Sequence, residues 1–113
     1  MTSRRSATLG PDARPVAIPP DIADTSVDKA HGTVQLPLHI RWSGSSKVYD
    51  LTRRPDRLRV YEQVLSEGTD DDIRRYIDVN ELLDLWDELV LPRRVSRAWA
   101  EWYQQHRGIR LSC

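Results

Sequence analysis

The segment from Asp78 to Pro92, DVNELLDLWDELVLP, constrains the fold more strongly than any other part of the chain. Its apolar residues recur at spacings of three and four, the period of a helix with one apolar face, and acidic residues fill the positions between them. Asp78 is a favourable N-cap, and Glu81 can complete a capping box three residues later. The sequence therefore predicts an amphipathic helix that Pro92 ends, because proline does not continue a helix. The apolar positions are Leu82, Leu83, Leu85, Trp86, Leu89 and Val90.

A second pattern, over residues 34–42, alternates apolar and polar residues with the two-residue period of a half-buried strand. Residues 43–46, which include a glycine, are a predicted turn, and residues 47–51 return as a second strand. Pro37 lacks an amide hydrogen, so the first strand is expected at an edge. Two strands alone are barely stable in water, and this hairpin must therefore pack on helices. The apolar positions of the first strand are Val34, Leu36, Leu38, Ile40 and Trp42.

Three further helices are predicted around the central one. Pro55 suits an early helical position, and the first of these helices runs to about Ser66 before Gly68. The second begins after Thr69, and its first turn holds Asp70, Asp71 and Asp72, where negative charge meets the positive end of the helix dipole. The third begins at Pro92, ends near Gly108, and has its apolar line at Val95, Ala98, Trp99 and Trp102. The predicted fold class is α+β, an N-terminal β-hairpin followed by about four short helices.

The chain of 113 residues has room for one domain. Residues 1–32 contain four of the seven prolines and show neither period, which indicates a disordered or extended arm. We expect a compact α+β domain over residues 33–108 and a C-terminal tail over residues 109–113. An arm that wraps a partner is the alternative interpretation of the N-terminal part.

Charge is balanced overall, with 17 basic and 17 acidic residues, so no global field draws the chain to nucleic acid or to an anionic membrane. The two kinds of charge are, however, concentrated in different segments of the chain. Residues 62–88 hold ten acids and two arginines, a net charge of −8, whereas residues 89–113 hold five arginines and one acid, a net charge of +4. The acidic middle can steer a basic partner or can be an ordinary solvated surface.

Cysteine use and hydropathy predict a cytoplasmic protein. Cys113 is the one cysteine and the last residue, so it closes no internal loop. The sequence after Arg4 and Arg5 contains no apolar run of signal-peptide length. No stretch approaches the roughly 20 apolar residues that cross a bilayer. No membrane partner is expected.

The residue types that carry chemistry are mostly missing. His31, His39 and His106 are far apart and have no acid or thiol at metal-ligand spacing, so we expect no metal site and no cofactor. Nucleotidyltransferases of the polymerase-β type follow Gly-Ser with a pair of carboxylates that hold magnesium. Here Gly44-Ser45 is followed at a suitable distance only by Asp56-Arg57-Leu58, and the second acid of the pair is absent. The chain is therefore predicted not to be an enzyme.

Aromatic residues and arginines gather near the C-terminal end. Four tryptophans and four tyrosines are too many large rings for a small core to hide completely, and exposed rings beside arginine are typical of protein interfaces. The alternative is that Trp86, Trp99 and Trp102 fill the junction of the last two helices. Arg93, Arg94 and Arg97 crowd the first turn of the last helix, where cations are unfavourable. They are expected to pair with the acids of the preceding helices or with a partner.

The run from Tyr49 to Trp102, with the words VYEQVLSEGT, LWDELVLP and RAWAEW, resembles a family of small actinobacterial proteins. These are antitoxins encoded beside nucleotidyltransferase toxins of the Men or AbiEii-like kind. The resemblance covers about half of the chain and leaves out the N-terminal arm. It implies a type II toxin-antitoxin partner: a protein that binds its cognate nucleotidyltransferase toxin and prevents it from adding nucleotides to RNA acceptors such as tRNA. It implies no catalytic residue.

Two contact models follow from these observations. In the first, acids attract the basic cleft of the toxin while arginines and an exposed tryptophan hold it, and the hairpin edge can add a strand to a partner sheet. In the second, the chain is a DNA-binding regulator whose last three helices form a helix-turn-helix variant on operator DNA, with the arginines on phosphates. The candidate partner-binding residues are Asp70, Asp71, Asp72, Asp84, Asp87, Glu88, Arg93, Arg94, Arg97 and Trp102.

Overall fold

The computed structural model describes residues 16–24, 28–41 and 47–112. Over these residues the chain is an α+β domain, as the sequence predicts, with two short antiparallel strands followed by four α-helices. Val34 lies opposite Tyr49 in the strand pair. The elements are β1 (Thr33–Gln35), β2 (Val48–Asp50), α2 (Arg54–Glu67), α3 (Asp70–Tyr76), α4 (Val79–Leu85), the 3₁₀ turn η2 (Trp86–Glu88) and α5 (Arg93–Arg107).

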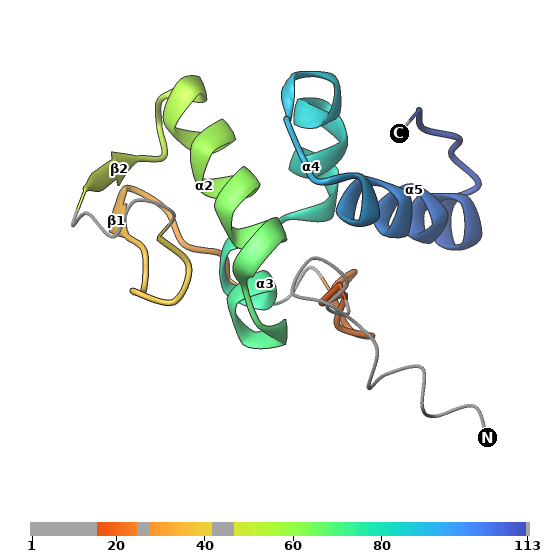
Figure 1. Cartoon of the computed structure of the whole chain (residues 1–113), viewed down its shortest axis with the longest axis horizontal. Coiled ribbons are helices and arrows are strands. Elements are labelled where there is room, and N and C mark those ends of the chain that lie inside the picture. The colour runs from red at the N-terminus through yellow and green to blue at the C-terminus, as the bar shows by residue number, and fades with distance from the viewer. Residues whose placement is uncertain (1–15, 25–27, 42–46, 113) are drawn as a thin grey trace.

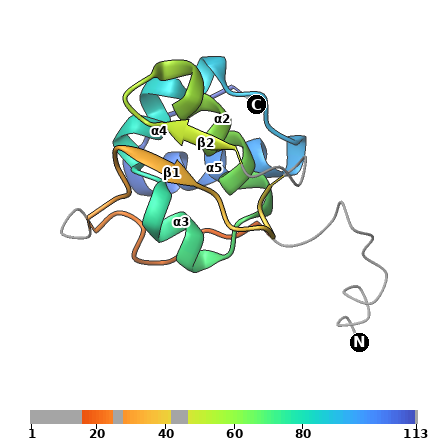
Figure 2. The same cartoon turned by 90° about the vertical axis from the view of Figure 1, so that its left-hand side faces the viewer.

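The helices form one body with the strand pair at one end and α5 at the other (Figure 1). α2 runs through the middle and contacts both β2 and α3. Seen from the strand end, β1 and β2 lie in front of the helices (Figure 2). The hairpin thus packs on helices, as a two-stranded sheet requires. The core is formed by apolar residues from every helix, among which Ile73, Leu82, Leu85, Val95 and Trp99 are fully buried.

α2 begins and ends close to where the sequence predicts, and α3 begins where it predicts. Pro55 occupies the first turn of α2, and the helix stops at Gly68, whose amide donates to the carbonyl oxygen of Val64 at 2.8 Å. A Cβ atom on Gly68 would lie 2.6 Å from that oxygen, so only glycine fits there. The predicted start of α3 is confirmed by a capping box: the Thr69 hydroxyl accepts from the Asp72 amide, and the Thr69 amide donates to the Asp72 carboxylate.

α4 begins at the predicted cap but ends earlier than predicted. Asp78 accepts hydrogen bonds from the amides of Asn80 and Glu81, at 2.8 and 3.1 Å. The predicted capping box with Glu81 is wrong, because the Asp78 amide donates to the hydroxyl of Tyr61 instead. The Glu81 carboxylate faces α2 and accepts from that same hydroxyl. A neighbouring helix has therefore replaced the local partner of the cap.

The predicted helix to Leu91 is interrupted by η2, after which residues 89–92 leave the helical path. The amide of Val90 donates to the buried carboxylate of Glu62 at 2.8 Å, a contact between residues that are 28 positions apart. Val90 is 77% exposed, so its predicted place on the apolar face is wrong. The long-range hydrogen bond explains why the helical period fails here.

α5 matches its prediction at both ends. Pro92 is the N-cap residue, and Gly108 ends the helix in the left-handed conformation with φ of 65°. Of the predicted apolar line, Val95, Trp99 and Trp102 are buried and Ala98 is half-buried. The amphipathic period is therefore a sound guide where one helix lies along one face of the core.

The first strand is much shorter than its alternation predicts. β1 spans only Thr33–Gln35, and the amide of Ile40 donates to the carbonyl of Pro37 in a turn. Leu36 and Ile40 are buried, whereas Leu38 is 69% exposed, so the apolar residues do not share one face. Pro37 explains the end of the strand, because it cannot donate to a ladder. Trp42 and the predicted turn over residues 43–46 lie outside the described residues.

The described part of the predicted arm packs on the domain. Pro19 and Ile22 are buried in the core, and Asp21 pairs with Arg74 of α3, with 2.9 Å between Oδ1 and Nε. The Lys29 ammonium donates to the carbonyl of Arg74 at 2.6 Å. Residues 16–24 and 28–32 therefore belong to the compact domain, which begins before the boundary that we expected at residue 33. Residues 1–15 lie outside the described range.

Candidate functional site

The predicted acidic surface is largely paired inside the protein. Arg54, at the start of α2, lies between Asp84 and Glu88, with its Nε 3.0 Å from Glu88 Oε2 and its Nη1 3.4 Å from Asp84 Oδ2. The hydrogen bonds from Arg54 lower the pKa of Glu88 below its usual range. These two acids fasten η2 and the end of α4 to α2, and Arg54 offsets one of their two negative charges.

Some of the acids at the start of α3 are also paired within the protein. The carboxylate of Asp72 caps the helix and lies 2.7 Å from His39 Nε2, while Asp71 pairs with Arg74 at 2.9 Å. Within the described residues Asp70 and Asp87 are exposed and make no ion pair. The strong negative charge of the sequence is therefore not one continuous free field.

The arginine surface, defined as Arg93, Arg94 and Arg97 at the start of α5, shows the opposite behaviour. Arg93 and Arg97 are exposed and Arg94 is half-buried. None of them pairs with a carboxylate in the part of the chain that the structure describes, so the expected contact with the acids of the preceding helices is not seen. Three cations are gathered at the positive end of a helix dipole without compensation.

An exposed apolar side chain stands next to this surface. Val90 lies in the linker that leads directly into α5. Beside it is a groove of about 390 Å³ between η2, the linker and Ser112 near the C-terminal end. Basic and apolar groups thus lie together at one edge of α5, a composition that is common at the centre of protein interfaces.

The predicted exposure of Trp102 is wrong. Its side chain is 8% exposed, stacks on His106 with 4.7 Å between ring centroids and meets Tyr103 edge-on at 5.1 Å. Trp86 and Trp99 are buried as well, so these three tryptophans fill the junction of the last helices. Trp102 is part of the packed interior beside α5, and its ring offers almost no exposed surface to a partner.

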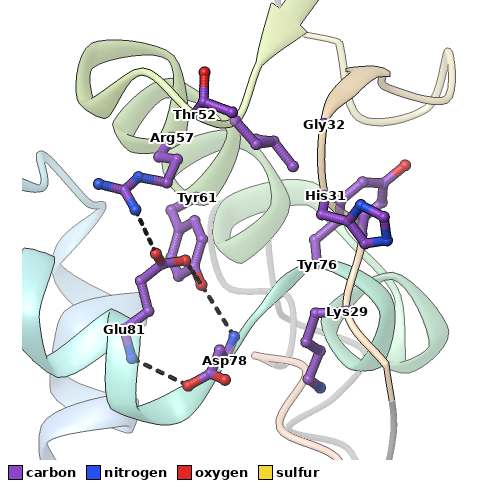
Figure 3. Close-up of a pocket in the computed structure, with 11 residues that line it drawn as sticks. Lys29, His31, Gly32, Thr52, Arg57, Tyr61, Tyr76, Asp78 and Glu81 are labelled. Atoms are coloured by element: carbon purple, nitrogen blue, oxygen red, sulfur yellow. Dashed lines mark hydrogen bonds and ion pairs between the residues drawn. The ribbon is translucent and has the colours of Figure 1, made fainter.

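A pocket of about 190 Å³ lies where the segment before β1, the start of α2 and the start of α4 meet (Figure 3). We call it the α2–α4 pocket. Its apolar wall consists of the tyrosine rings and small aliphatic groups, and its polar wall carries two cations and two carboxylates. The lining residues are Lys29, Ala30, His31, Gly32, Leu51, Thr52, Arg57, Tyr61, Tyr76, Asp78 and Glu81.

A row of hydrogen bonds fixes one wall of the pocket. Arg57 Nη1 lies 2.8 Å from Glu81 Oε2, and the Tyr61 hydroxyl donates to Glu81 Oε1 at 2.7 Å. The Tyr61 oxygen in turn accepts from the Asp78 amide at 3.0 Å. Burial raises the pKa of Tyr61, so its hydroxyl stays protonated and acts as the donor. Burial also lowers the pKa of Lys29 on the far side of the pocket.

Two groups of this wall have unused bonding capacity. Arg57 Nε is buried and has no hydrogen-bond partner among the described residues. Asp78 uses Oδ1 for both helix amides, while its Oδ2 makes no hydrogen bond within the described part of the chain. This pocket could not be predicted from the sequence, because its residues come from segments up to 52 positions apart and form no local motif.

Two features bear on the class of protein. In the described residues no group of three histidine, cysteine or acidic side chains lies close enough to hold a metal ion. No helix in those residues is long and apolar enough to span a bilayer. Comparisons of the chain with protein-family models, curated proteins and solved structures gave no match.

Proposed function

We propose that this chain is a non-catalytic antitoxin that binds and neutralises a cognate nucleotidyltransferase toxin in the cytoplasm by direct protein contact. The sequence resemblance suggests the partner. One observation of the structure supports a role in binding: the arginine surface beside Val90 lacks carboxylate partners within the described residues. Each cation near the positive end of a helix dipole costs roughly 0.3–1 kcal/mol when no anion compensates it, and an anionic partner would remove that cost.

The charge of the partner follows from the same surface. A nucleotidyltransferase holds magnesium with carboxylates in its active site. Guanidinium groups form paired hydrogen bonds with carboxylates, so Arg93 and Arg97 can neutralise such a site in place of the metal. Asp84 and Glu88 are less suited to lead the contact, because Arg54 already occupies them.

The test uses the protein encoded beside this gene, purified, with tRNA and a nucleoside triphosphate as substrates. The wild-type chain is expected to suppress nucleotide addition in a stoichiometric complex. The double variant Arg93→Glu/Arg97→Glu should bind about 100-fold more weakly, because charged contacts at an interface become repulsive. The variant should still fold, since both side chains are exposed and glutamate is favourable at position 93 in the first turn of the helix.

Matched controls separate this contact from a general charge effect. Arg53 and Arg110 are also exposed, and Arg53→Glu/Arg110→Glu should inhibit the toxin like the wild type. Charge reversal of Asp84, Asp87 and Glu88 tests the acid-led contact that the sequence suggested. Full inhibition by the Arg93→Glu/Arg97→Glu variant would overturn the arginine contact. Absence of any complex with the neighbouring protein would overturn the proposed function.

A second candidate is a DNA-binding regulator, and the same arginine surface favours it. Cations at the start of an exposed helix can contact phosphates of operator DNA, in which case affinity falls steeply with salt. A mobility shift with the upstream DNA, with and without the neighbouring protein, tests this candidate. A shift that the Arg93→Glu/Arg97→Glu variant loses, without any toxin complex, would favour regulation over neutralisation.

A further inference from the structure

We propose that the α2–α4 pocket binds a small zwitterion of the α-amino acid type, with its carboxylate at Arg57 and its ammonium group at Asp78. The two residues lie at opposite ends of the row that Glu81 and Tyr61 complete (Figure 3). A ligand that lies along this row meets a spare donor at one end and a spare acceptor at the other. This inference is independent of the proposed function, because the arginine surface contributes nothing to the pocket.

The donor end is Arg57. Its Nη1 is held by Glu81, which fixes the orientation of the guanidinium plane. Its Nη2 makes no hydrogen bond among the described residues, and the side chain is 28% exposed. A carboxylate in the pocket can accept from Nη2 while Glu81 keeps its own contact at Nη1, because the guanidinium has five donors.

The acceptor end is Asp78. Its Oδ1 is fixed by the amides at the start of α4, which keep the carboxylate in place. Its Oδ2 makes no hydrogen bond within the described residues, and the ring of Tyr76 lines the pocket with it. An ammonium group can therefore donate to Oδ2 without displacing the helix cap.

The charge balance selects a zwitterion over a simple ion. Lys29 and Arg57 supply two positive charges to the pocket, and Asp78 and Glu81 supply two negative ones. An anion alone would be attracted by Arg57 but repelled by Asp78. A cation alone would be attracted by Asp78 but repelled by Arg57. A ligand that is neutral overall, with its charges separated, gains at both ends.

The size of the pocket limits the ligand. Its volume of about 190 Å³ corresponds to roughly six water molecules at about 30 Å³ each in the liquid. This suits a free amino acid of small or medium size and excludes a nucleoside triphosphate. The methyl group of Ala30, the side chain of Leu51 and the ring of Tyr76 offer an apolar wall for the ligand's side chain.

The test is a titration of the full chain, labelled with nitrogen-15, with each proteinogenic amino acid in turn. Saturable amide shifts are expected at residues 29–32, 51–61 and 76–81, with a dissociation constant of about 1 mM or lower for the preferred amino acid. Acetate and methylamine serve as single-charge controls and should bind at least about tenfold more weakly. If no amino acid gives saturable shifts in these segments, the inference is overturned.

Two conservative variants test the two ends. Arg57→Lys keeps a cation opposite Glu81 but removes the second terminal nitrogen of the guanidinium, and Asp78→Asn keeps a capping oxygen but removes the charge. Each should weaken binding by about tenfold or more. Arg53→Lys and Asp87→Asn make the same chemical changes outside the pocket and should leave the affinity unchanged.

Circular dichroism shows whether each variant is folded. One folded pocket variant is enough to test the proposed orientation of the zwitterion. Wild-type affinity in a folded Arg57→Lys or Asp78→Asn variant would overturn the assignment of that end and with it the zwitterion. Equal loss in the controls outside the pocket would also overturn it.

Discussion

The two charged regions of this protein differ in where their partners lie. The acids around Arg54 are paired within the chain and connect η2 with α2. The arginines at the start of α5 have no carboxylate partner in the described part and stand at the unfavourable end of a helix dipole. The first region therefore serves the fold, whereas the second is unfavourable for the fold, and in the proposed function it contacts the partner. Substitutions in the two regions should change stability in opposite directions.

The largest effect is expected at Glu62, which joins the two regions. Its buried carboxylate accepts from the Val90 amide, in the linker between η2 and the arginine surface. Glu62→Ala should lower the free energy of unfolding by about 1–3 kcal/mol, because it leaves that amide without its acceptor. Urea denaturation measures this change. Glu62→Gln retains a side-chain oxygen and should lose much less, and an equal loss in both variants would contradict the role of the hydrogen bond.

Neutralising the arginine surface should raise stability. Arg93→Gln and Arg97→Gln each remove a cation from the positive end of α5, and each should add about 0.3–1 kcal/mol to the free energy of unfolding. Urea denaturation at low ionic strength is the appropriate measurement, since salt screens the effect. Arg107→Gln, at the other end of α5, is the control and should lower stability. If Arg93→Gln and Arg97→Gln are less stable than the wild type, these arginines serve the fold after all.

The sequence could predict some features of this structure and not others, and the difference lies in how far apart in the chain the contacting residues are. Where the determining contacts are local, as at Thr69, Gly68 and Gly108, the predicted ends of helices are confirmed. Where a distant residue decides, the prediction fails. The Val90 amide is bound by Glu62, and the cap of α4 is completed by Tyr61, and neither pairing leaves a trace in the local pattern.

The candidate sites follow the same rule. The acids and arginines are recognisable in the sequence as charged groups, but the sequence does not show that Arg54 pairs with Asp84 and Glu88 while Arg97 has no such partner among the described residues. It also placed Trp102 at the surface, because burial depends on how other helices cover a side chain. The α2–α4 pocket depends wholly on tertiary structure. No periodicity or spacing could have brought Lys29 and Glu81 together.

A smaller effect is expected at Arg54 itself. Arg54→Ala should lower stability, because Asp84 and Glu88 lose their counter-charge and repel each other. The loss should shrink as salt is added, since these side chains are largely exposed and their interaction is screened. Unfolding is to be compared at low and high ionic strength, with Arg53→Ala as the exposed neighbour that makes no such pair. A loss that does not change with salt would show that packing, and not charge, connects η2 with α2.

The smallest effect concerns pH, and it separates the two regions once more. Arg54 lowers the pKa of Glu88 in the folded protein below its value in the unfolded chain. The folded state therefore binds a proton at Glu88 less readily, and the stabilisation is fully present above the unfolded pKa and is lost as pH falls through the folded pKa. Glu88→Gln should remove this part of the acid dependence, so that the stability difference from the wild type is largest near neutral pH and fades in acid. Arg97→Gln removes a cation and leaves every carboxylate in place, and its effect should persist across the same acid range while the protein remains folded. Urea denaturation at a series of pH values measures both curves, and a Glu88→Gln difference that grows toward acid pH would reverse the sign and exclude the Arg54 pair as its cause.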